Sequence, residues 1–450
     1  MQSPYQVIEV DLRQGVPELT VQPGYEGLFV VLWCGNIPLG SLEIMATQLP
    51  LSRWDFTNQI AQAIAPAVGS YLLPHGFKAP LPVLSANPAR DQPPDLATLM
   101  ALTNPLHQLE AIEPAFSEMA SVSIVICTRD RPEQLERCLH SLQALSQPPQ
   151  QIVVVDNAPR SAATKQLVAQ FPSIEYVLEP RPGLSVARNT GIAHSTADLV
   201  VFTDDDVVVH SGWLLGLRRG FTDSIVMAVT GLMLPAELES EAQIIFHRGG
   251  GDSGWGFRAR TYDAQFLDEI KARGAPVWRI GAGANMAFRR EVFDRLGNFD
   301  ERLGAGASGC SEDSEMWYRV LAEGYSCRYE PSAVIYHYHR KDLDSLKHQA
   351  FHYMRGHVVA LLIQFDRYRH WGNLRRLAIE LPIYYTKMLI LAVLNRFQQR
   401  YKTVFVEIWG CLSGIGFYWQ HRSPAPTLPV ALSDPASTLP DATAQSIRPL

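Results

Sequence analysis

Apolar runs alternate with helical stripes between residues 121 and 203. Runs rich in β-branched residues predict buried strands, and leucines spaced three and four residues apart after Pro132 predict a helix that begins at this proline. The predicted strands are Ser121–Cys127, Gln151–Val155, Ile174–Leu178 and Asp198–Thr203, with a helix between each pair. This alternation predicts a parallel sheet with right-handed crossovers.

Polar side chains follow three of these strands. Thr128 follows the first strand, Asp156 the second, and Asp204, Asp205 and Asp206 the fourth. Because ligands of parallel sheets bind beyond the carboxyl ends of the strands, we expect these side chains to share one site. Adjacent carboxylates repel one another unless a cation neutralises them, and their oxygens suit Mg²⁺ or Mn²⁺. The pattern predicts a metal that holds a diphosphate, and an acidic turn is the alternative.

Later elements add further candidates. Arg188, at the start of the third helix, is placed to neutralise phosphate charge, and an exposed helix arginine is the alternative. Asn285 lies in a predicted strand, Ile280–Phe288, where close backbone approach would let it bond a sugar hydroxyl. Glu312 and Asp313 open another predicted helix, where acids either complement the helix dipole or act as a general base.

A final strand is predicted at Ala333–His339. Since alternate residues of a strand share a face, His337 and His339 should point the same way. Either imidazole could complete a metal site begun by the acids, and a structural role is the alternative.

Two regions before the first of these strands carry no recognisable chemistry. Residues 1–78 predict a small α+β accessory domain, because Val7–Leu12 and Gly27–Cys34 predict strands and residues 54–71 have helical spacing. Recurrent prolines predict a linker over residues 79–119, so that the next domain begins at residue 120.

A glycine-rich segment, Arg248–Gly256, lies within the central region, residues 120–340. It has too many glycines for regular structure and lacks the lysine of a phosphate-cradling loop. It predicts either a mobile loop that closes over a ligand or a disordered surface loop.

The C-terminal part is basic and apolar. Residues 340–402 contain 12 Lys and Arg against 4 Asp and Glu. Leu381–Leu394 and Thr403–Trp419 are apolar but shorter than the roughly 20 residues that span a bilayer. Residues 341–422 therefore predict basic helices on an anionic membrane surface, and a helical subdomain packed on the sheet is the alternative. Residues 423–450, rich in Pro, Ala, Ser and Thr, predict a disordered tail.

Composition narrows the class of protein. With 47% hydrophobic and 19% charged residues among 450, the chain is expected to be globular, and its net charge of −6 gives no sign of a nucleic-acid partner. Six scattered cysteines without a C-x-x-C pair predict reduced thiols in the cytosol. The first residues lack the pattern of a signal peptide, so we expect a cytoplasmic protein.

Six motifs occur in a familiar order. They are Val122–Arg131, Val153–Asn157, Gly183–Ile192, Phe202–Asp206, Ala284–Phe288 and the pair Glu312 and Asp313. Over residues 120–340 the chain therefore resembles the family 2 glycosyltransferases. The resemblance implies a GT-A fold, an α/β architecture in which helices flank a Rossmann-like, mostly parallel sheet. The small N-terminal α+β domain and the helical C-terminal region would be additions to it.

The resemblance also implies a donor site. Thr128 and Asp156 match the positions that hold the nucleotide's base and ribose, and Arg188 matches one near the base and phosphates. Asp204 meets the sugar nucleotide as the first acid of the D-x-D motif. Asp205 is counted with the donor-binding residues, as is Asn285.

The resemblance also implies which residues bind the metal and which one acts as the catalytic base. Asp206, with Asp204, would bind Mn²⁺ or Mg²⁺, and His337 or His339 resembles a late histidine that ligates the metal in some members. Asp313 matches the catalytic base, with Glu312 as the second candidate.

The implied reaction is inverting transfer of one sugar from a UDP-, dTDP- or GDP-linked donor to a glycan or lipid-linked acceptor. The expected role is cell-surface or lipid-linked glycan synthesis on the inner face of the plasma membrane. The Q-x-x-R-W signature of processive synthases does not follow Asp313, which disfavours polymerisation. The alternatives are a sugar-phosphate nucleotidyltransferase, or a non-catalytic carbohydrate- or membrane-binding scaffold of the same fold. The nucleotidyltransferase should carry a glycine-rich basic loop after the first strand, where this chain has Thr128–Pro132.

Overall fold

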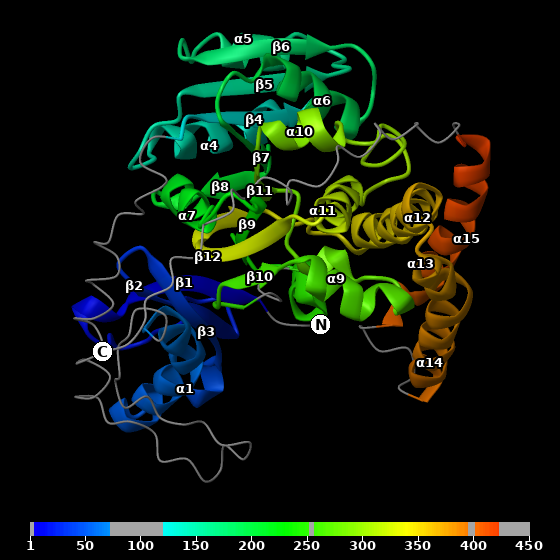
Figure 1. The fold of residues 1–450 in the computed structure, drawn as a ribbon. Helices are drawn as coiled ribbons and strands as arrows, with labels where there is room; N and C mark the ends of the chain where they lie inside the picture. The colour runs from blue at the N-terminus through cyan, green and yellow to red at the C-terminus, as the bar shows by residue number, and fades with distance from the viewer. Residues whose placement is uncertain (1–3, 73–119, 252–255, 395–400, 423–450) are drawn as a thin grey trace, which may run out of the picture.

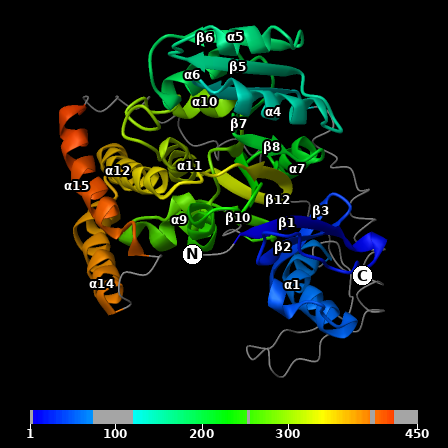
Figure 2. The ribbon, with the colours of Figure 1, turned by 180° about the vertical axis from the view of Figure 1, so that it is seen from behind.

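The computed structural model describes residues 4–72, 120–251, 256–394 and 401–422. The predicted linker, the predicted disordered tail and residues 252–255 of the glycine-rich segment lie outside the described residues. A three-stranded sheet with one long helix lies beside a nine-stranded sheet, and the C-terminal helices lie along one side of the molecule (Figure 1). Figure 2 shows the same arrangement from behind.

The N-terminal unit consists of β1 Tyr5–Asp11, β2 Gly27–Cys34, β3 Ile37–Met45 and α1 Arg53–Leu72. β2 pairs in parallel with β1 and antiparallel with β3. Every residue of β2 is buried because its two faces have different partners. One face joins the core that α1 covers, and the other, which includes Phe29, Val31 and Trp33, joins the core of the central sheet. The predicted strands and helix of this unit are confirmed.

The central sheet has the strand order β10-β12-β9-β11-β7-β4-β5-β6, and β8 pairs with β12 beside this path. The strands are β4 Val122–Thr128, β5 Gln151–Asn157, β6 Ile174–Glu179, β7 Leu199–Asp204, β8 Val207–Val209, β9 Val226–Pro235, β10 Arg260–Tyr262, β11 Asn285–Arg289 and β12 Ser326–His337. β7, β4, β5 and β6 run parallel, as predicted, and β12 runs parallel to β9. β11 is antiparallel to both of its neighbours. The predicted fold class, an α/β architecture with a mostly parallel sheet flanked by helices, is confirmed.

Helices cover both faces of this sheet. They are α4 Pro132–Gln143, α5 Ala163–Val168, α6 Leu184–His194, α7 Trp213–Gly220, α10 Glu291–Leu296 and α11 Glu312–Ala322. α4, α5 and α7 share one apolar core with the sheet, while α6, α10 and α11 share the other. The sheet is therefore buried on both sides, which explains its uninterrupted apolar strands.

Shorter elements follow β9. They are α8 Glu241–Phe246, the π-helical turn η5 His247–Gly251, α9 Ala264–Ile270, and the 3₁₀ turns η7 Lys271–Arg273 and η8 Val277–Arg279. The prediction that the glycine-rich segment has no regular structure is wrong for residues 248–251, because α8 continues into η5. Arg248 ties this turn to the N-terminal unit, donating to Glu43 at 2.9 Å and to the Tyr5 hydroxyl at 3.2 Å.

The C-terminal helices are α12 Leu343–Tyr368, α13 Trp371–Arg375, the π-helical η9 Arg376–Glu380, α14 Leu381–Leu394 and α15 Val404–Gln420. α13, η9 and α14 form one helix of 24 residues, and the most apolar 18-residue stretch of this helix has a mean hydropathy of 1.7. By length and composition alone this helix could cross a membrane. The apolar segment Leu381–Leu394 itself has 14 residues, and the ten helical residues before it include Arg375, Arg376 and Glu380, so the expectation for this segment stays a prediction.

Candidate active site

A cavity of about 2670 Å³ lies beyond the carboxyl ends of β4 and β7. β4 is flanked by β5 on one side and β7 on the other, so the order of strands reverses at this point of the sheet. Open α/β sheets bind ligands at such reversals. The ends of β4 and β7, together with α6, α11 and β12, line one end of the cavity, and α12, α14 and the start of α15 line the other.

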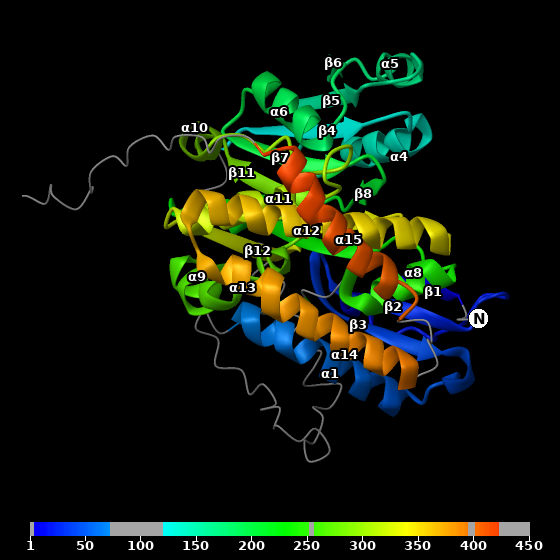
Figure 3. The same cartoon turned by 90° about the vertical axis from the view of Figure 1, so that its right-hand side faces the viewer.

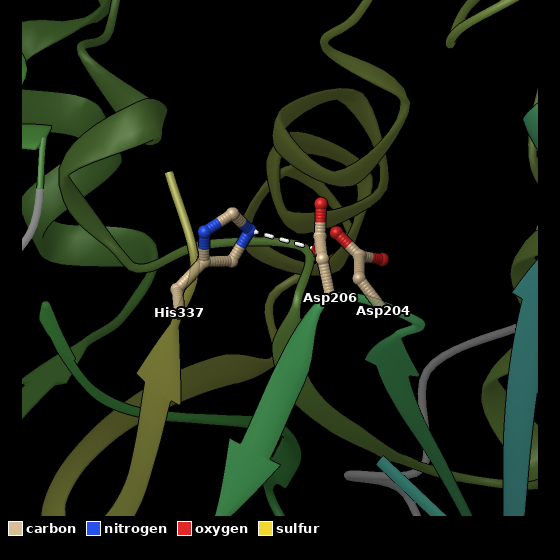
Figure 4. A group of neighbouring side chains, drawn as sticks. All are labelled: Asp204, Asp206 and His337. Carbon is tan, nitrogen blue, oxygen red and sulfur yellow. Dashed lines mark ion pairs between the residues drawn. The ribbon is translucent and has the colours of Figure 1, made fainter. Parts of the chain in front are cut away.

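Strand pairing brings an acidic pair to a histidine. β7 ends at Asp204, and a tight turn leads into β8, where Val207 lies opposite His337 of β12. The Asp206 carbonyl accepts a hydrogen bond from the Tyr338 amide at 3.0 Å, which fixes the turn against β12. His337 Nε2 lies 3.2 Å from Asp206 Oδ1, and the ligand atoms of Asp204, Asp206 and His337 all lie within 4.8 Å of one another (Figure 4).

The electrostatics of this group fit a cation. Burial raises the pKa of Asp204, and the nearby negative charge of Asp206 raises it further. Burial would raise the pKa of Asp206 too, but the His337 imidazole and the Arg131 guanidinium hold it well below its usual range. Two carboxylates and an imidazole form a donor set that Mn²⁺ accepts, and the carboxylates also suit Mg²⁺. The residues present therefore fit the divalent ion that the sequence predicts.

The middle acid of the triplet serves a different purpose. Asp205 Oδ2 accepts a hydrogen bond from Thr128 Oγ1 at 2.7 Å, and Oδ1 accepts one from Arg131 Nη1 at 3.1 Å. Burial and the charge of Asp206 raise the pKa of Asp205 to about 6. Asp205 thus ties the loop after β4 to the loop after β7. Thr128 and Asp205 line the cavity, but their hydrogen-bonding groups are directed at each other.

Arg188 is a buried cation at the centre of the site. Its side chain is 3% exposed, and Nη1 donates to Glu312 Oε1 at 2.5 Å. Nη2 lies 3.6 Å from Asp204 Oδ1 and donates to the Gly283 carbonyl at 3.3 Å. The alternative of an exposed helix arginine is excluded, because this side chain joins α6 to β7 and α11.

The acidic pair that opens α11 is divided between two environments. Glu312 is buried against Arg188, and burial raises its pKa to about 7. Asp313 is half-buried on the cavity wall, where Oδ1 accepts from the Ser314 amide at 2.6 Å. Ser311, just before the pair, has a left-handed backbone with φ of 72°. This strained residue turns the chain so that α11 begins at the cavity.

A glycine makes room for the second carboxylate. A Cβ on Gly283 would lie 2.9 Å from Asp313 Oδ2 and 3.1 Å from Arg188 Nη2. A larger residue would therefore displace one of these two charged groups.

Of the other predicted residues, Asp156 lies away from the cavity wall and His339 lines it. Asp156 is fully buried, with Oδ2 accepting from the Tyr176 hydroxyl at 2.9 Å, and burial raises its pKa. His339 lies past the end of β12, and its ring stacks on His337 at a centroid distance of 4.3 Å. It is outside the three-residue group that could hold an ion.

The hypothesis that Asn285 bonds a sugar is contradicted by its surroundings. Its carboxamide is fully buried, and Oδ1 accepts from Trp213 Nε1 at 2.8 Å. Nδ2 donates to the carbonyls of Leu232 and Ala333, at 3.0 and 2.8 Å. Its carboxamide is thus engaged in the core, where it links β9 and β12 to each other and to α7.

Sequence reasoning missed several residues of the site. Arg131 lies 3.4 Å from Asp206 and follows Thr128 closely in the chain, so its position after a strand was an available signal. Gly283 and Ser311 had no such signal, because their importance depends on side chains from other elements.

Comparison with known proteins agrees with the geometry. Residues 123–297 match the family described as Glycosyl transferase family 2. A pre-mycofactocin glycosyltransferase of Mycobacterium tuberculosis is 29% identical over 246 residues, covering 53% of this chain and 47% of that protein. The succinoglycan biosynthesis protein ExoM of Rhizobium meliloti is 28% identical over 227 residues, covering 49% of this chain and 67% of that protein.

A solved structure also matches. The mannosyltransferase PcManGT from Pyrobaculum calidifontis, in complex with GDP-Man and Mn²⁺, is 16% identical with a TM-score of 0.44. The match covers 67% of this chain and 89% of that chain. This chain spans about half the length of the mycobacterial relative. Residues 123–297 are therefore similar to the family 2 glycosyltransferases, in the part of the chain where the motif order predicted the resemblance.

Proposed function

We propose that this chain contains a family 2 glycosyltransferase domain, which transfers a single sugar from a nucleotide-diphospho-sugar to an acceptor hydroxyl with inversion. One observation supports this most strongly. A group suited to a divalent cation and a separate half-buried carboxylate, Asp313, line the same cavity, and Arg188 lies between them. That is the arrangement needed to stabilise a leaving diphosphate on one side and activate a hydroxyl on the other.

In this proposal Asp204, Asp206 and His337 hold Mn²⁺ or Mg²⁺. When bound, the ion supplies positive charge that offsets the negative charge developing on the leaving diphosphate. Arg188 contributes a permanent positive charge beside Asp204, and its burial among fixed partners holds that charge in place.

Asp313 is the proposed general base. Both acids line the cavity, but Glu312 is less suited because its carboxylate is bonded to Arg188 and buried, whereas Asp313 is only half-buried. A single displacement by the activated hydroxyl inverts the anomeric configuration, and no covalent intermediate is required. Thr128 and Asp156 are the proposed contacts for the base and ribose, and Asp156 would have to become accessible for this role.

The substrates and cellular setting extend the same proposal. The donor is a UDP-, dTDP- or GDP-linked sugar, and the acceptor is a glycan or a lipid-linked glycan of the cell surface. The protein acts in the cytoplasm at the inner face of the plasma membrane. In this proposal residues 1–78 form an accessory domain, residues 120–340 the catalytic domain and residues 341–422 a basic helical region.

The test is a thermal-shift panel of nucleoside diphosphates and their sugars with Mn²⁺, Mg²⁺ or EDTA. A ligand that binds the native state raises its melting temperature. We expect one nucleotide to raise it in the presence of metal and not with EDTA. Absence of a shift with every nucleotide and metal would contradict the proposed function.

A further inference from the structure

The outer face of α15 is an uncharged apolar stripe. Phe405, Trp409, Leu412 and Trp419 are 60%, 63%, 57% and 62% exposed, and their spacing places them on one side of the helix. The carboxylate of α15, Glu407, is directed inward, where it accepts hydrogen bonds from Tyr385 at 3.0 Å and Thr403 at 2.6 Å.

The inner side of α15 is built for tight packing on α12. A Cβ on Gly414 would lie 2.7 Å from the Arg355 carbonyl, and one on Gly410 would lie 3.2 Å from the Met354 Cβ. The orientation of α15 is thus fixed by backbone contact. Because Gly410 and Gly414 face α12, Trp409 and Trp419 lie on the opposite, exposed side of α15.

α14 continues the apolar surface. Ile379, Ile383, Ile390 and Leu394 are 48%, 62%, 57% and 73% exposed along one side of the helix that ends in α14. Lys387 lies on this side too. In Figure 3, α15 crosses in front of α12, and α14 runs below α12. We define the docking face as the exposed apolar residues of these two helices, which are Ile379, Ile383, Ile390, Leu394, Phe405, Trp409, Leu412 and Trp419.

This surface carries more exposed large hydrophobic residues than the rest of the described molecule. Of 16 exposed large hydrophobic residues among those described, 11 lie within residues 371–419. Soluble surfaces scatter such residues singly, and a concentration of them marks an interaction site. The docking face therefore has a partner.

The chemistry of the face favours a lipid bilayer. Tryptophans at two levels of α15 suit the boundary between head groups and acyl chains. Lys387 would be a buried charge in an interface with a second copy of the chain, but at a bilayer its ammonium can extend to the head groups. The positive charge of the exposed Lys387 on this face favours anionic lipid.

The same helices also form a wall of the cavity. Tyr384, Tyr385 and Met388 of α14 line it, as do Tyr401 and Lys402 before α15. One layer of helix thus separates the cavity from the docking face.

We propose that the docking face lies on an anionic bilayer and that the cavity receives from it an acceptor with an apolar chain and a polar head. The chain would remain with α14 and α15 while the head reaches Asp313. The identity of the acceptor rests on the proposed function, whereas binding of the face to a bilayer does not.

The test uses the purified full-length chain and flotation with vesicles of phosphatidylcholine, alone or mixed with phosphatidylglycerol. We expect binding that is stronger to the mixed vesicles. The double variant Trp409→Ser, Trp419→Ser should bind them at least about tenfold more weakly. The matched control is Trp54→Ser on α1, which removes an equally exposed tryptophan, 71% exposed, from another surface and should bind as the wild type does.

Lys387→Glu should reduce the preference for phosphatidylglycerol while leaving binding to phosphatidylcholine nearly unchanged. Phe405→Ser is the second variant if the double variant fails to fold, as judged by circular dichroism. Equal flotation of wild type and face variants would overturn the proposal. So would a wild-type dimer that the variants dissociate in sedimentation without any vesicle binding, because the partner would then be a second copy.

Failure of the proposed function is distinguishable from failure of the docking face. The metal-dependent thermal shift with a nucleoside diphosphate should be the same in the wild type and in the face variants. Vesicle binding without any nucleotide shift would refute the glycosyltransferase proposal alone. A nucleotide shift without vesicle binding would refute the docking face alone.

Discussion

Asn285 offers a direct way to separate a structural residue from a substrate-binding one. β9 and β12 pair in parallel, but their register breaks between Glu330 and Val334. The Asn285 carboxamide fills this break, bonding one carbonyl from each strand and the indole of Trp213. Replacement by alanine would leave one N–H donor and two carbonyls unpaired in the core.

Each unpaired buried group costs about 1–3 kcal/mol, so we expect Asn285→Ala, which leaves three of them, to lower the free energy of unfolding by about 3–9 kcal/mol. That is a large part of the roughly 5–15 kcal/mol by which a typical domain is stable. The matched control, Trp213→Phe, removes one of the three hydrogen bonds and should cost about 1–2 kcal/mol. Urea unfolding followed by circular dichroism measures both.

Asn285→Ala should leave the nucleotide-binding site intact. Protein that remains folded should bind nucleoside diphosphate and metal with nearly wild-type affinity, since Asn285 does not line the cavity. A wild-type unfolding midpoint combined with weakened nucleotide binding would refute the structural role and restore the sugar contact.

Three further variants test the site. Asp206→Ala should weaken the metal-dependent thermal shift with nucleotide, and an undiminished shift would place the ion elsewhere. Gly283→Ala should lower turnover by about 10–100-fold by displacing Asp313 or Arg188, with little change in melting temperature, and unaltered kinetics would contradict that crowding. The pKa of Glu312 is raised from 4.5 to about 7, so the stability it contributes is present below about pH 4.5 and is lost as the pH rises through about 7. The free energy of unfolding of Glu312→Gln, measured with urea, should therefore rise by up to about 3 kcal/mol relative to that of the wild type as the pH increases from about 5 to about 8. A difference between the two proteins that stays constant over this range would refute the raised pKa.

β4, β5 and β7 could be predicted because nearly all of their residues are buried, which demands a continuous apolar run. β6, at the edge of the sheet, has Glu175 and Leu178 exposed between buried positions. β8 and β10 have three residues each, too few for a periodic pattern to indicate them. Yet β8 decides the metal group, since its pairing with β12 sets His337 rather than His339 beside Asp206.

The roles within acidic pairs could not be read from the order of residues. Glu312 and Asp313 are neighbours in the chain, and only the position of Arg188, which comes from α6, shows which carboxylate is committed to an ion pair. Asn285 was misjudged for the same reason, because its partners belong to three other elements. Sequence indicates which polar residues reach an edge of a sheet, but packing decides what each one contacts.

We propose above all that Asp313 activates the acceptor hydroxyl, and that the site binds its nucleotide-sugar donor equally well when Asp313 is replaced. The most direct measurement compares wild type and Asp313→Asn for metal-dependent nucleotide binding and for sugar transfer from the donor that the panel identifies. General bases contribute about 10²–10⁴-fold, so we predict a loss of transfer of that size with the nucleotide thermal shift preserved. Normal transfer by correctly folded Asp313→Asn would contradict the account and assign the base to another residue.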